Sequence, residues 1–328
     1  MPRLKRKNGG KSKNNAFYSV TLVIIGIITA WFISNSAWDP ISDFFGLNES
    51  PKVSRTAEGD IQVHFIDVGQ GDCALILTED KAVLIDSGDA EYADKVIQYI
   101  RKMGVGSLDL IIVSHPHADH IGGMAQIIKT VNTDRLLMPK LPDELIPTGN
   151  IFERMAIAIE DHSVQASLVE YDKRLDFDLG GAILEIFAPT PTDGFDGLND
   201  YSLITRLIHG DNSFLFTGDM EKAAENAVLE KGFDLSATVL KVAHHGSRTS
   251  SQRGFLAKTD GIYAVISVGS PNRYNHPNDE VIRRLKEMNY SILRTDQAGT
   301  IVFESTQDGN LNIVHDNPIP AENREDAA

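Results

Sequence analysis

Short apolar runs divided by glycine and aspartate open the central part of the chain. Four of them are IQVHFIDVG, CALILTE, KAVLIDSG and LDLIIVS. Runs of this length, rich in Val, Ile and Leu and bounded by turn residues, are typical of strands in a packed sheet. Between the third and fourth runs, EYADKVIQYIRKMG has helical spacing, with Asp89 suited to the N-cap and Gly104 to the position past the end.

The same alternation continues towards the C-terminus. Helices are predicted at GGMAQIIKTV, IFERMAIAIEDH, EKAAENAVLEKG and PNDEVIRRLKEMN. Strands are predicted at AILEIFAP, SLITRLIHG, SFLFTGD, TVLKVAHH, YAVISVG, SILRTD and GTIVFES. The turn Gly210–Asn212 joins two of these strands as a hairpin. Strands that alternate with helices in a mixed order predict an α/β domain whose sheets carry helices on their outer faces.

A different pattern precedes this domain. Residues 16–33 form a run of 18 uncharged, mostly apolar residues, close to the roughly 20 that cross a bilayer. Six Lys and Arg side chains lie before it, which places that end in the cytoplasm and the domain outside. The predicted product is a single-pass protein of the cell membrane. A cleaved signal peptide, which would give a secreted protein, and a buried helix are the alternative interpretations.

We therefore expect five segments along the chain. They are a basic cytoplasmic head at 1–15, a transmembrane anchor at 16–38, a linker at 39–59, a folded domain at 60–315 and a flexible tail at 316–328. The linker mixes Pro, Gly, Ser and charged residues without periodicity, as linkers do.

Charge and cysteine content narrow the possible functions. Six of the 31 Lys and Arg residues precede Asp39, so 25 basic and 46 acidic side chains remain, a net charge of −21. Broad electrostatic capture of nucleic acid requires a basic face, so a polyanionic substrate has to be held locally. Cys73 is the sole cysteine, which excludes a disulfide within the chain and favours a small core residue.

Several predicted strands end in histidine or aspartate, and one segment concentrates them. Residues 115–120 read His-Pro-His-Ala-Asp-His and hold three of the ten histidines. In an extended chain His115 and His117 point to the same side, so both can bind one metal ion. Asp119 and His120 follow as the backbone turns into a helix, and suit a neighbouring position. Imidazole and carboxylate are ligands that zinc, manganese and iron accept.

The motif SHPHADHIGG resembles the HxHxDH signature of metallo-β-lactamase-fold hydrolases. Further motifs are similar to the soluble hydrolase (nuclease) domain of the competence protein ComEC, in similar order over residues 60–306: FIDVGQGD, LIDSG, FTGD, KVAHHGS and NHP. The resemblance implies that residues 60–315 form a four-layer αββα metallo-β-lactamase sandwich, preceded in this chain by one transmembrane helix.

The resemblance also implies a ligand set for two divalent metal ions, with zinc expected and manganese or iron as alternatives. The implied metal ligands are His115, His117, Asp119, His120, Asp219 and His245, with Asp219 bridging. Asp86 and His244 are implied to lie behind these ligands. Whether His244 or His245 binds metal stays open; His245 is favoured because Gly246 and Ser247 follow it. Asp119 and His276 are the candidates for catalysis, His276 as a proton donor or phosphate contact.

One departure from the family concerns the interval between the signature and Asp219. Many members place another metal-binding histidine there, and this chain offers His162 and His209, both expected at the surface. The candidates for substrate binding are Asn199, Ser202, Lys241, Arg248 and Arg273. Arg253 is a further cation close to the motifs, and cations of this kind hold phosphates. His64 and His315 alternate with apolar neighbours and are expected to be structural.

The predicted function is a metal-dependent hydrolase, an extracytoplasmic phosphodiesterase or DNase in which a hydroxide bridging two metals attacks the substrate. The expected partners are a phosphodiester, DNA or a cell-envelope polymer, and the membrane through the N-terminal helix. One alternative is a cell-envelope phosphodiesterase similar to phosphorylcholine esterases, which the acidic domain favours. Another is a non-catalytic binding module of a membrane assembly, which the intact ligand set disfavours.

Overall fold

A computed structural model describes Thr56 and residues 59–317 of the chain. The predicted cytoplasmic head and membrane anchor, most of the linker and the end of the tail lie outside these residues. Among the residues that are described, no helix has the length and apolarity needed to cross a membrane.

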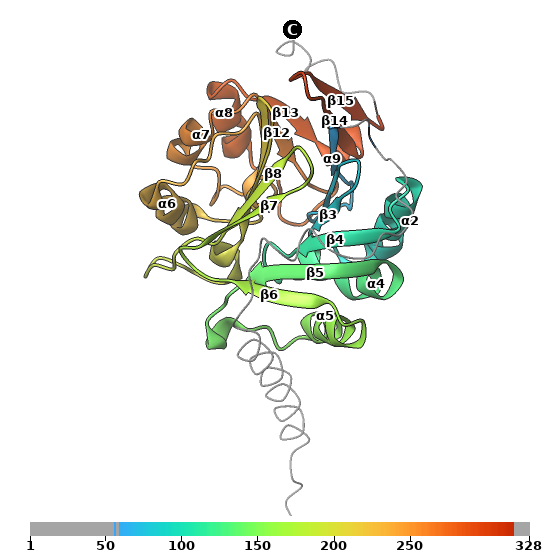
Figure 1. Cartoon of the computed structure of the whole chain (residues 1–328). Helices are drawn as coiled ribbons and strands as arrows, with labels where there is room; N and C mark the ends of the chain where they lie inside the picture. The colour runs from blue at the N-terminus through green and yellow to red at the C-terminus, as the bar shows by residue number, and fades with distance from the viewer. Residues whose placement is uncertain (1–55, 57–58, 318–328) are drawn as a thin grey trace, which may run out of the picture. The chain divides into compact units, whose positions relative to one another are not determined.

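Two mixed sheets form the centre of the domain (Figure 1). The first sheet has the spatial order β15 (Leu311–His315), β14 (Ile301–Ser305), β1 (Ile61–Phe65), β2 (Ala74–Leu77), β3 (Ala82–Ile85), β4 (Ser107–Ile112), β5 (Asn132–Pro139) and β6 (Gln165–Val169). The second has the order β13 (Ser291–Arg294), β12 (Tyr263–Ile266), β11 (Val239–Lys241), β10 (Asn212–Phe216), β9 (Ile204–His209), β8 (Ile183–Phe187) and β7 (Arg174–Asp178). Strands β3 to β6 and β10 to β13 are parallel, and the other pairs are antiparallel.

Helices cover the outer face of each sheet. Beside the first sheet lie α2 (Ala93–Lys102), α3 (Ala118–Ile121), α4 (Met124–Thr130) and α5 (Asn150–Asp161). Beside the second lie α6 (Lys222–Lys231), α7 (Arg253–Thr259) and α8 (Asp279–Glu287). The short elements are α9 (Thr295–Ala298), η1 (Ala90–Tyr92), η2 (Asp143–Leu145), η3 (Leu198–Tyr201) and η4 (Ala243–Gly246). The layers are therefore helix, sheet, sheet, helix.

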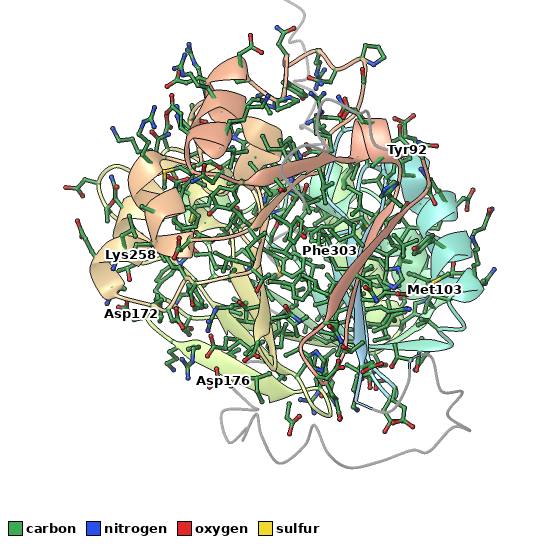
Figure 2. The ribbon with its side chains drawn as sticks, turned by 90° about the horizontal axis from the view of Figure 1, so that it is seen from above. Tyr92, Met103, Asp172, Asp176, Lys258 and Phe303 are labelled. Atoms are coloured by element: carbon green, nitrogen blue, oxygen red, sulfur yellow. The ribbon has the colours of Figure 1, made fainter. Side chains whose placement is uncertain are left out.

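Aromatic side chains fill the space between the two sheets. Phe65 of β1 stacks on Phe216 of β10, with ring centroids 5.5 Å apart. Phe303 of β14 meets Phe214 of β10 edge to face at 5.8 Å. Figure 2 shows Phe303 in the interior, whereas Lys258 lies at the periphery. Because each ring removes a large apolar area from water, these contacts fix one sheet against the other.

The residues of α2 show how the outer layer is built. Ala93, Val96, Ile97 and Ile100 are buried, and this spacing places them on one helical face. The helix begins later than the sequence indicates, because residues 90–92 form the 3₁₀ turn η1, and Asp89 makes no side-chain capping hydrogen bond.

Three strands in the middle of the chain escaped the sequence-based prediction. These are β5, β6 and β7, with the sequences NTDRLLMP, QASLV and RLDFD. Their charged and polar positions weaken the apolar signal, and β6 and β7 lie at the ends of their sheets. Strand pairing, rather than local pattern, determines these elements. Cys73 is buried just before β2, in agreement with its predicted core position.

Candidate metal centre

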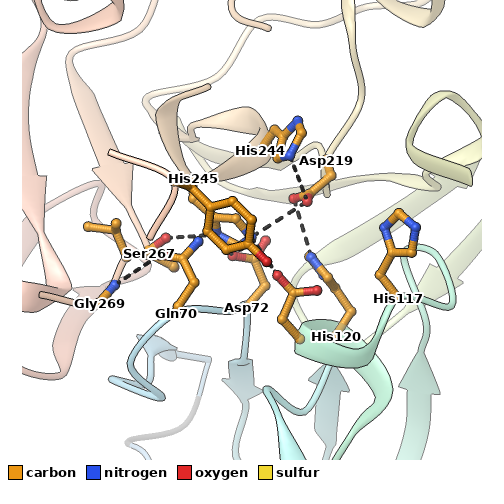
Figure 3. Close-up of polar contacts among 12 residues, drawn as sticks. Gln70, Asp72, His117, His120, Asp219, His244, His245, Ser267 and Gly269 are labelled. Carbon is orange, nitrogen blue, oxygen red and sulfur yellow. Dashed lines mark hydrogen bonds and ion pairs between the residues drawn. The ribbon is translucent and has the colours of Figure 1, made fainter. Parts of the chain in front are cut away.

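The candidate residues meet where strands of both sheets end. Asp86 follows β3, residues 115–120 follow β4, Asp219 follows β10, and His244 and His245 lie in η4 directly after β11. Parallel strands end at a common edge, so side chains from distant parts of the chain gather there. In Figure 3, His120 and His244 point towards Asp219 from different sides.

Four residues form a closed group of possible metal ligands: Asp119, His120, Asp219 and His245 each offer an atom within 4.8 Å of the others. The Nε2 atom of His120 lies 3.3 Å from Oδ1 of Asp219. The Nε2 atom of His245 lies 3.3 Å from Oδ2 of Asp119 and 3.5 Å from Oδ2 of Asp219.

Three atoms of this group are buried polar atoms without a hydrogen-bond partner: Nε2 of His120, Nε2 of His245 and Oδ1 of Asp219. Leaving such atoms unsatisfied is costly, and buried native polar groups are normally paired. Nitrogen and carboxylate ligands that converge in this way fit a divalent metal ion. The residues present therefore fit the group that the signature implies.

The other half of the signature also lies beside Asp219. The Nε2 atom of His115 is 2.9 Å from Nδ1 of His117 and 4.0 Å from Oδ2 of Asp219. The Nε2 atom of His244 lies 3.7 Å from the same oxygen. Within residues 59–317 these side chains do not form a group as closely spaced as the first. One set of ligands is thus assembled, and a second is partly assembled around the same carboxylate.

His120 is oriented by a carboxylate behind it. Its Nδ1 atom lies 2.9 Å from Oδ2 of Asp86, which also accepts a 2.6 Å hydrogen bond from the Ser114 hydroxyl. The second oxygen of Asp86 accepts from the Ser114 backbone N–H at 2.8 Å. This arrangement leaves Nε2 of His120 directed at Asp219, as in carboxylate–histidine–metal relays. The geometry fits the role that the family resemblance implies for Asp86.

His245 has a corresponding partner, which the sequence analysis missed. Its Nδ1 atom lies 3.2 Å from Oδ1 of Asp72 and 2.9 Å from the Ser267 carbonyl oxygen. The other oxygen of Asp72 makes a 2.6 Å ion pair with Lys241. Asp72 is the last residue of the motif FIDVGQGD, and its position directly before a strand was the available signal.

Lys241 does not fit its predicted role as a phosphate contact. It is only 3% exposed, and its ammonium group pairs with Asp72 and donates to the Val242 carbonyl oxygen at 2.9 Å. Asp72 also belongs, with Asp86 and His120, to a second group of possible metal ligands. Because the ammonium already neutralises Asp72, this second group is a poorer cation site than the first.

Unusual backbone conformations hold the ligands in place. His244 and His245 have φ angles of 51° and 52°, in the left-handed region that non-glycine residues rarely adopt. Such strain persists where the surroundings fix it, and it often marks functional sites. At Gly218, with φ 49°, an added Cβ would lie 2.8 Å from Cβ of Ser114. Glycine at that position lets the Asp219 turn approach the strand that carries the signature.

The cluster has a distinctive charge state. Burial lowers the pKa of His120, but the carboxylates of Asp219 and Asp86 outweigh burial and raise this pKa well above its ordinary value. In the same way Asp219 and Asp72 outweigh burial and raise the pKa of His245 to about 10. Despite burial, His245 and His120 hold the pKa of Asp219 well below its usual range. Without a metal, two imidazolium groups therefore face an ionised carboxylate.

The sequence profile of the metallo-beta-lactamase superfamily matches residues 66–269. The chain belongs to this superfamily. It is 32% identical over 271 residues to ComE operon protein 3 of Bacillus subtilis. The aligned region covers 76% of this chain and 33% of that protein. It is 30% identical over 248 residues to competence protein ComA of Neisseria gonorrhoeae, covering 75% and 32%. The chain thus spans about a third of the length of these curated relatives.

A solved structure supports the fold. The metallo-beta-lactamase fold protein YhfI of Bacillus subtilis matches with a TM-score of 0.50 and 14% identity, over 75% of this chain and all of that one. At this identity the likeness concerns the fold alone. The expected metallo-β-lactamase fold and the resemblance to ComEC-like proteins are both confirmed.

The two histidines between the signature and Asp219 both have positions outside the group of candidate ligands. His162 is exposed at the end of α5, as predicted. His209 was predicted at the surface, and this prediction is wrong, because the imidazole is only 2% exposed. Its nitrogens lie 2.7 Å from the Ser305 hydroxyl and 2.7 Å from the Gly59 carbonyl oxygen, since neighbouring chain segments cover the hairpin.

Two predicted substrate contacts support the centre from behind. The Ser202 hydroxyl is buried and accepts a 3.1 Å hydrogen bond from the Asp219 backbone N–H, so it holds the turn and does not fit a substrate contact. The Asn199 amide donates at 3.3 Å to Glu221. Glu221 in turn lies 3.2 Å from Nδ1 of His244. Asn199 and Glu221 thereby orient His244 towards Asp219.

The remaining candidates are exposed or half-buried side chains. Arg248 is exposed just after η4, and Arg253 is exposed on α7, where it pairs with Glu287. Arg273 is exposed in the segment before α8. His276 is half-buried, with its ring centroid 5.5 Å from that of His244. Burial, His244 and His245 lower the pKa of His276 to about 4.

Binding of zinc to the metal-free protein at pH 7 should release about two protons, one each from His120 and His245, because coordination requires neutral imidazole. Isothermal titration calorimetry in buffers of different ionisation enthalpy measures this number. Metal affinity should fall as the pH is lowered, since protons compete for the same nitrogens. His245→Gln should reduce the release by about one proton, whereas the matched surface variant His162→Gln should not. Zinc binding without proton release would contradict this charge state.

Proposed function

We propose that this chain is a metal-dependent phosphodiesterase that acts outside the cytoplasm, with a polynucleotide as its substrate. The position of Asp219 is the main support for this proposal. Its carboxylate faces the closed ligand group, and its Oδ2 atom also lies 4.0 Å from Nε2 of His115 and 3.7 Å from Nε2 of His244. A carboxylate in that position suits a two-metal centre, the arrangement found in many phosphoester hydrolases.

Asp119, His120, Asp219 and His245 would hold one divalent ion, and His115, His117 and Asp219 would hold the other. Bound ions of this kind polarise a phosphoryl oxygen and lower the pKa of water. Zinc, manganese and iron all suit this donor set. His244 faces Asp219 on the side of the second position, where it is the nearest substitute for the histidine missing from the interval.

Asp119 is the member of the closed group that reaches solvent. Its side chain is 27% exposed, whereas those of His120, Asp219 and His245 are almost fully buried. Burial favours the neutral form of Asp119, but the neighbouring His245 and the charge of His120 lower its pKa, so the carboxylate is ionised at neutral pH. An ionised carboxylate at the open side of the group accepts a proton from an attacking water.

His276 lies within electrostatic reach of this carboxylate and is neutral at pH 7 in the free protein, because burial, His244 and His245 lower its pKa to about 4. A neutral imidazole offers one N–H to a phosphate oxygen or to the leaving oxygen. Its Nδ1 atom is buried and has no hydrogen-bond partner among the described residues. A bound phosphodiester anion raises the pKa of His276 and favours proton donation.

The choice of substrate rests on the relatives and on the surface cations. One of the two curated relatives is named a competence protein, and the resemblance to the hydrolase (nuclease) domain of ComEC implies a nucleic acid as substrate. Arg248 is exposed three residues after His245, and Arg273 is exposed three residues before His276, so each offers a guanidinium group to a phosphate. The location outside the cytoplasm rests on the basic N-terminus and the apolar run of residues 16–33, which lie outside the described residues.

The metal-loaded protein should hydrolyse bis(nitrophenyl) phosphate and single-stranded DNA, and should leave a cephalosporin intact. Chelation should abolish turnover, and Asp219→Asn should lower kcat/KM by at least about 10²-fold, because the variant loses a shared ligand charge. Val314→Ala, an exposed position on β15, is the control and should match the wild type. Turnover of the cephalosporin without turnover of any phosphodiester would refute the proposal. Preference for a phosphorylcholine ester would favour the cell-envelope alternative.

His276→Ala should slow hydrolysis of an alkyl phosphodiester by roughly 10²- to 10⁴-fold, the range of general acid catalysis. A nitrophenyl leaving group departs without a proton, so hydrolysis of its ester should be slowed much less. Metal content, measured by elemental analysis, should stay at the wild-type level. Equal slowing of both esters would indicate phosphate binding instead of proton donation, and loss of metal would indicate a structural role.

A further inference from the structure

The segment between β12 and α8, residues 269–278, forms a fixed wall beside the metal centre. The Asn272 side chain holds it in shape, because its amide donates to the carbonyl oxygens of Gly269 at 2.8 Å and His276 at 2.7 Å. Its side-chain oxygen accepts from the His276 backbone N–H at 3.0 Å. The Asn278 backbone N–H donates to the Gly246 carbonyl oxygen at 2.9 Å, which ties the wall to η4.

This wall carries an exposed aromatic side chain close to the site. Tyr274 is 47% exposed, and among the described residues the other exposed large hydrophobic side chains are aliphatic. Its ring lies nearly parallel to that of His276, with centroids 5.7 Å apart and planes inclined by 23°. The ring centroid of His276 in turn lies 5.5 Å from that of His244, and Nε2 of His244 faces Asp219. A series of rings thus leads from the candidate metal centre to the surface.

A guanidinium group completes the exposed end of this series. The Arg273 guanidinium carbon lies 4.8 Å from the centroid of the Tyr274 ring, and Nη2 donates a 2.6 Å hydrogen bond to the Tyr274 hydroxyl. Tyr274 raises the pKa of Arg273, and the Asp119 carboxylate adds to this effect, which places Arg273 on the side of the site. Tyr274 and Arg273 together present an aromatic ring and a planar cation, which we call the Arg273–Tyr274 platform.

The chemistry of this platform selects among phosphodiesters. A quaternary ammonium group such as choline binds to aromatic faces that have no competing cation, and Arg273 already supplies a positive charge here. A nucleobase is neutral and planar, so it stacks on aromatic rings and guanidinium planes alike. The cation also attracts the next phosphate of a strand. The platform therefore suits a nucleotide better than a choline ester.

Resting on the proposed phosphodiesterase function, we propose that the Arg273–Tyr274 platform is a subsite for the nucleobase next to the scissile phosphodiester. The substrate is then a polynucleotide strand whose bases are unpaired, since a base inside a duplex is already stacked on both faces. Stacking is sequence-tolerant, because every base has a π-face. The strongly acidic domain needs no broad basic surface if stacking supplies part of the affinity.

Two esters with the same leaving group test this subsite: thymidine 5′-(4-nitrophenyl phosphate), which carries a base, and methyl 4-nitrophenyl phosphate, which does not. The wild-type, metal-loaded protein should favour the thymidine ester in kcat/KM by about 5- to 150-fold, the range that base–aromatic stacking supplies. Tyr274→Ala should bring this ratio close to one, and Tyr274→Phe should retain it, because the aromatic face is kept. Ile262→Ala, another exposed hydrophobic position, is the control and should leave the ratio unchanged.

Each other outcome has a defined meaning. Hydrolysis of both esters by the wild type at equal kcat/KM would overturn the subsite and leave the phosphodiesterase function intact. Failure to hydrolyse either ester would refute the proposed function, and the subsite with it. A third ester, 4-nitrophenylphosphorylcholine, tests the competing ligand: if Tyr274→Ala slows it more than the thymidine ester, the platform binds a quaternary ammonium group and the inference is wrong.

Discussion

The carboxylate of Asp219 is buried at the junction of the two sheets, and its ionised state determines the arrangement around it. An isolated buried charge is strongly unfavourable, so it has to be paired and hydrogen-bonded. His120 and His245 supply positive charge in the metal-free protein, and each imidazole is backed by a further carboxylate, Asp86 or Asp72. Lys241 ends one of these chains of alternating charge. Replacing the imidazolium protons by a divalent ion keeps the same balance of charge.

This constraint explains why the supporting residues are polar although most of them are buried. Ser114 fixes Asp86, Ser202 fixes the Asp219 turn, and Glu221 fixes His244. The left-handed backbone at His244 and His245 and the glycine at position 218 allow β10 and β11 to bring these side chains close to β4. The centre therefore depends on strand ends from both sheets, and the aromatic contacts of Phe65 and Phe303 keep those ends in register.

Local sequence predicted the parts of the site that depend on local geometry. The six residues from His115 to His120 bring their own ligands together, so spacing alone indicated a metal site. Asp219 and His245 required the family resemblance, because only the fold brings them to the signature. Asp72 belongs to the motif FIDVGQGD and directly precedes a predicted strand, but its role appears only when the turn after β1 meets His245. The exposure of His209 and the role of Lys241 were misjudged for a related reason: burial of a polar side chain depends on partners far away in sequence.

Anomalous diffraction from crystals of the protein grown with manganese or zinc tests the central claim most directly, because it locates the ion without assuming any activity. We expect an anomalous peak at coordination distance, about 2.0–2.2 Å for zinc, from Nε2 of His120 and His245 and from the Asp219 carboxylate. A peak at the second group of possible ligands, between Asp72 and Asp86, would contradict the account. So would crystals in which the four ligands bind no metal at all at millimolar concentrations.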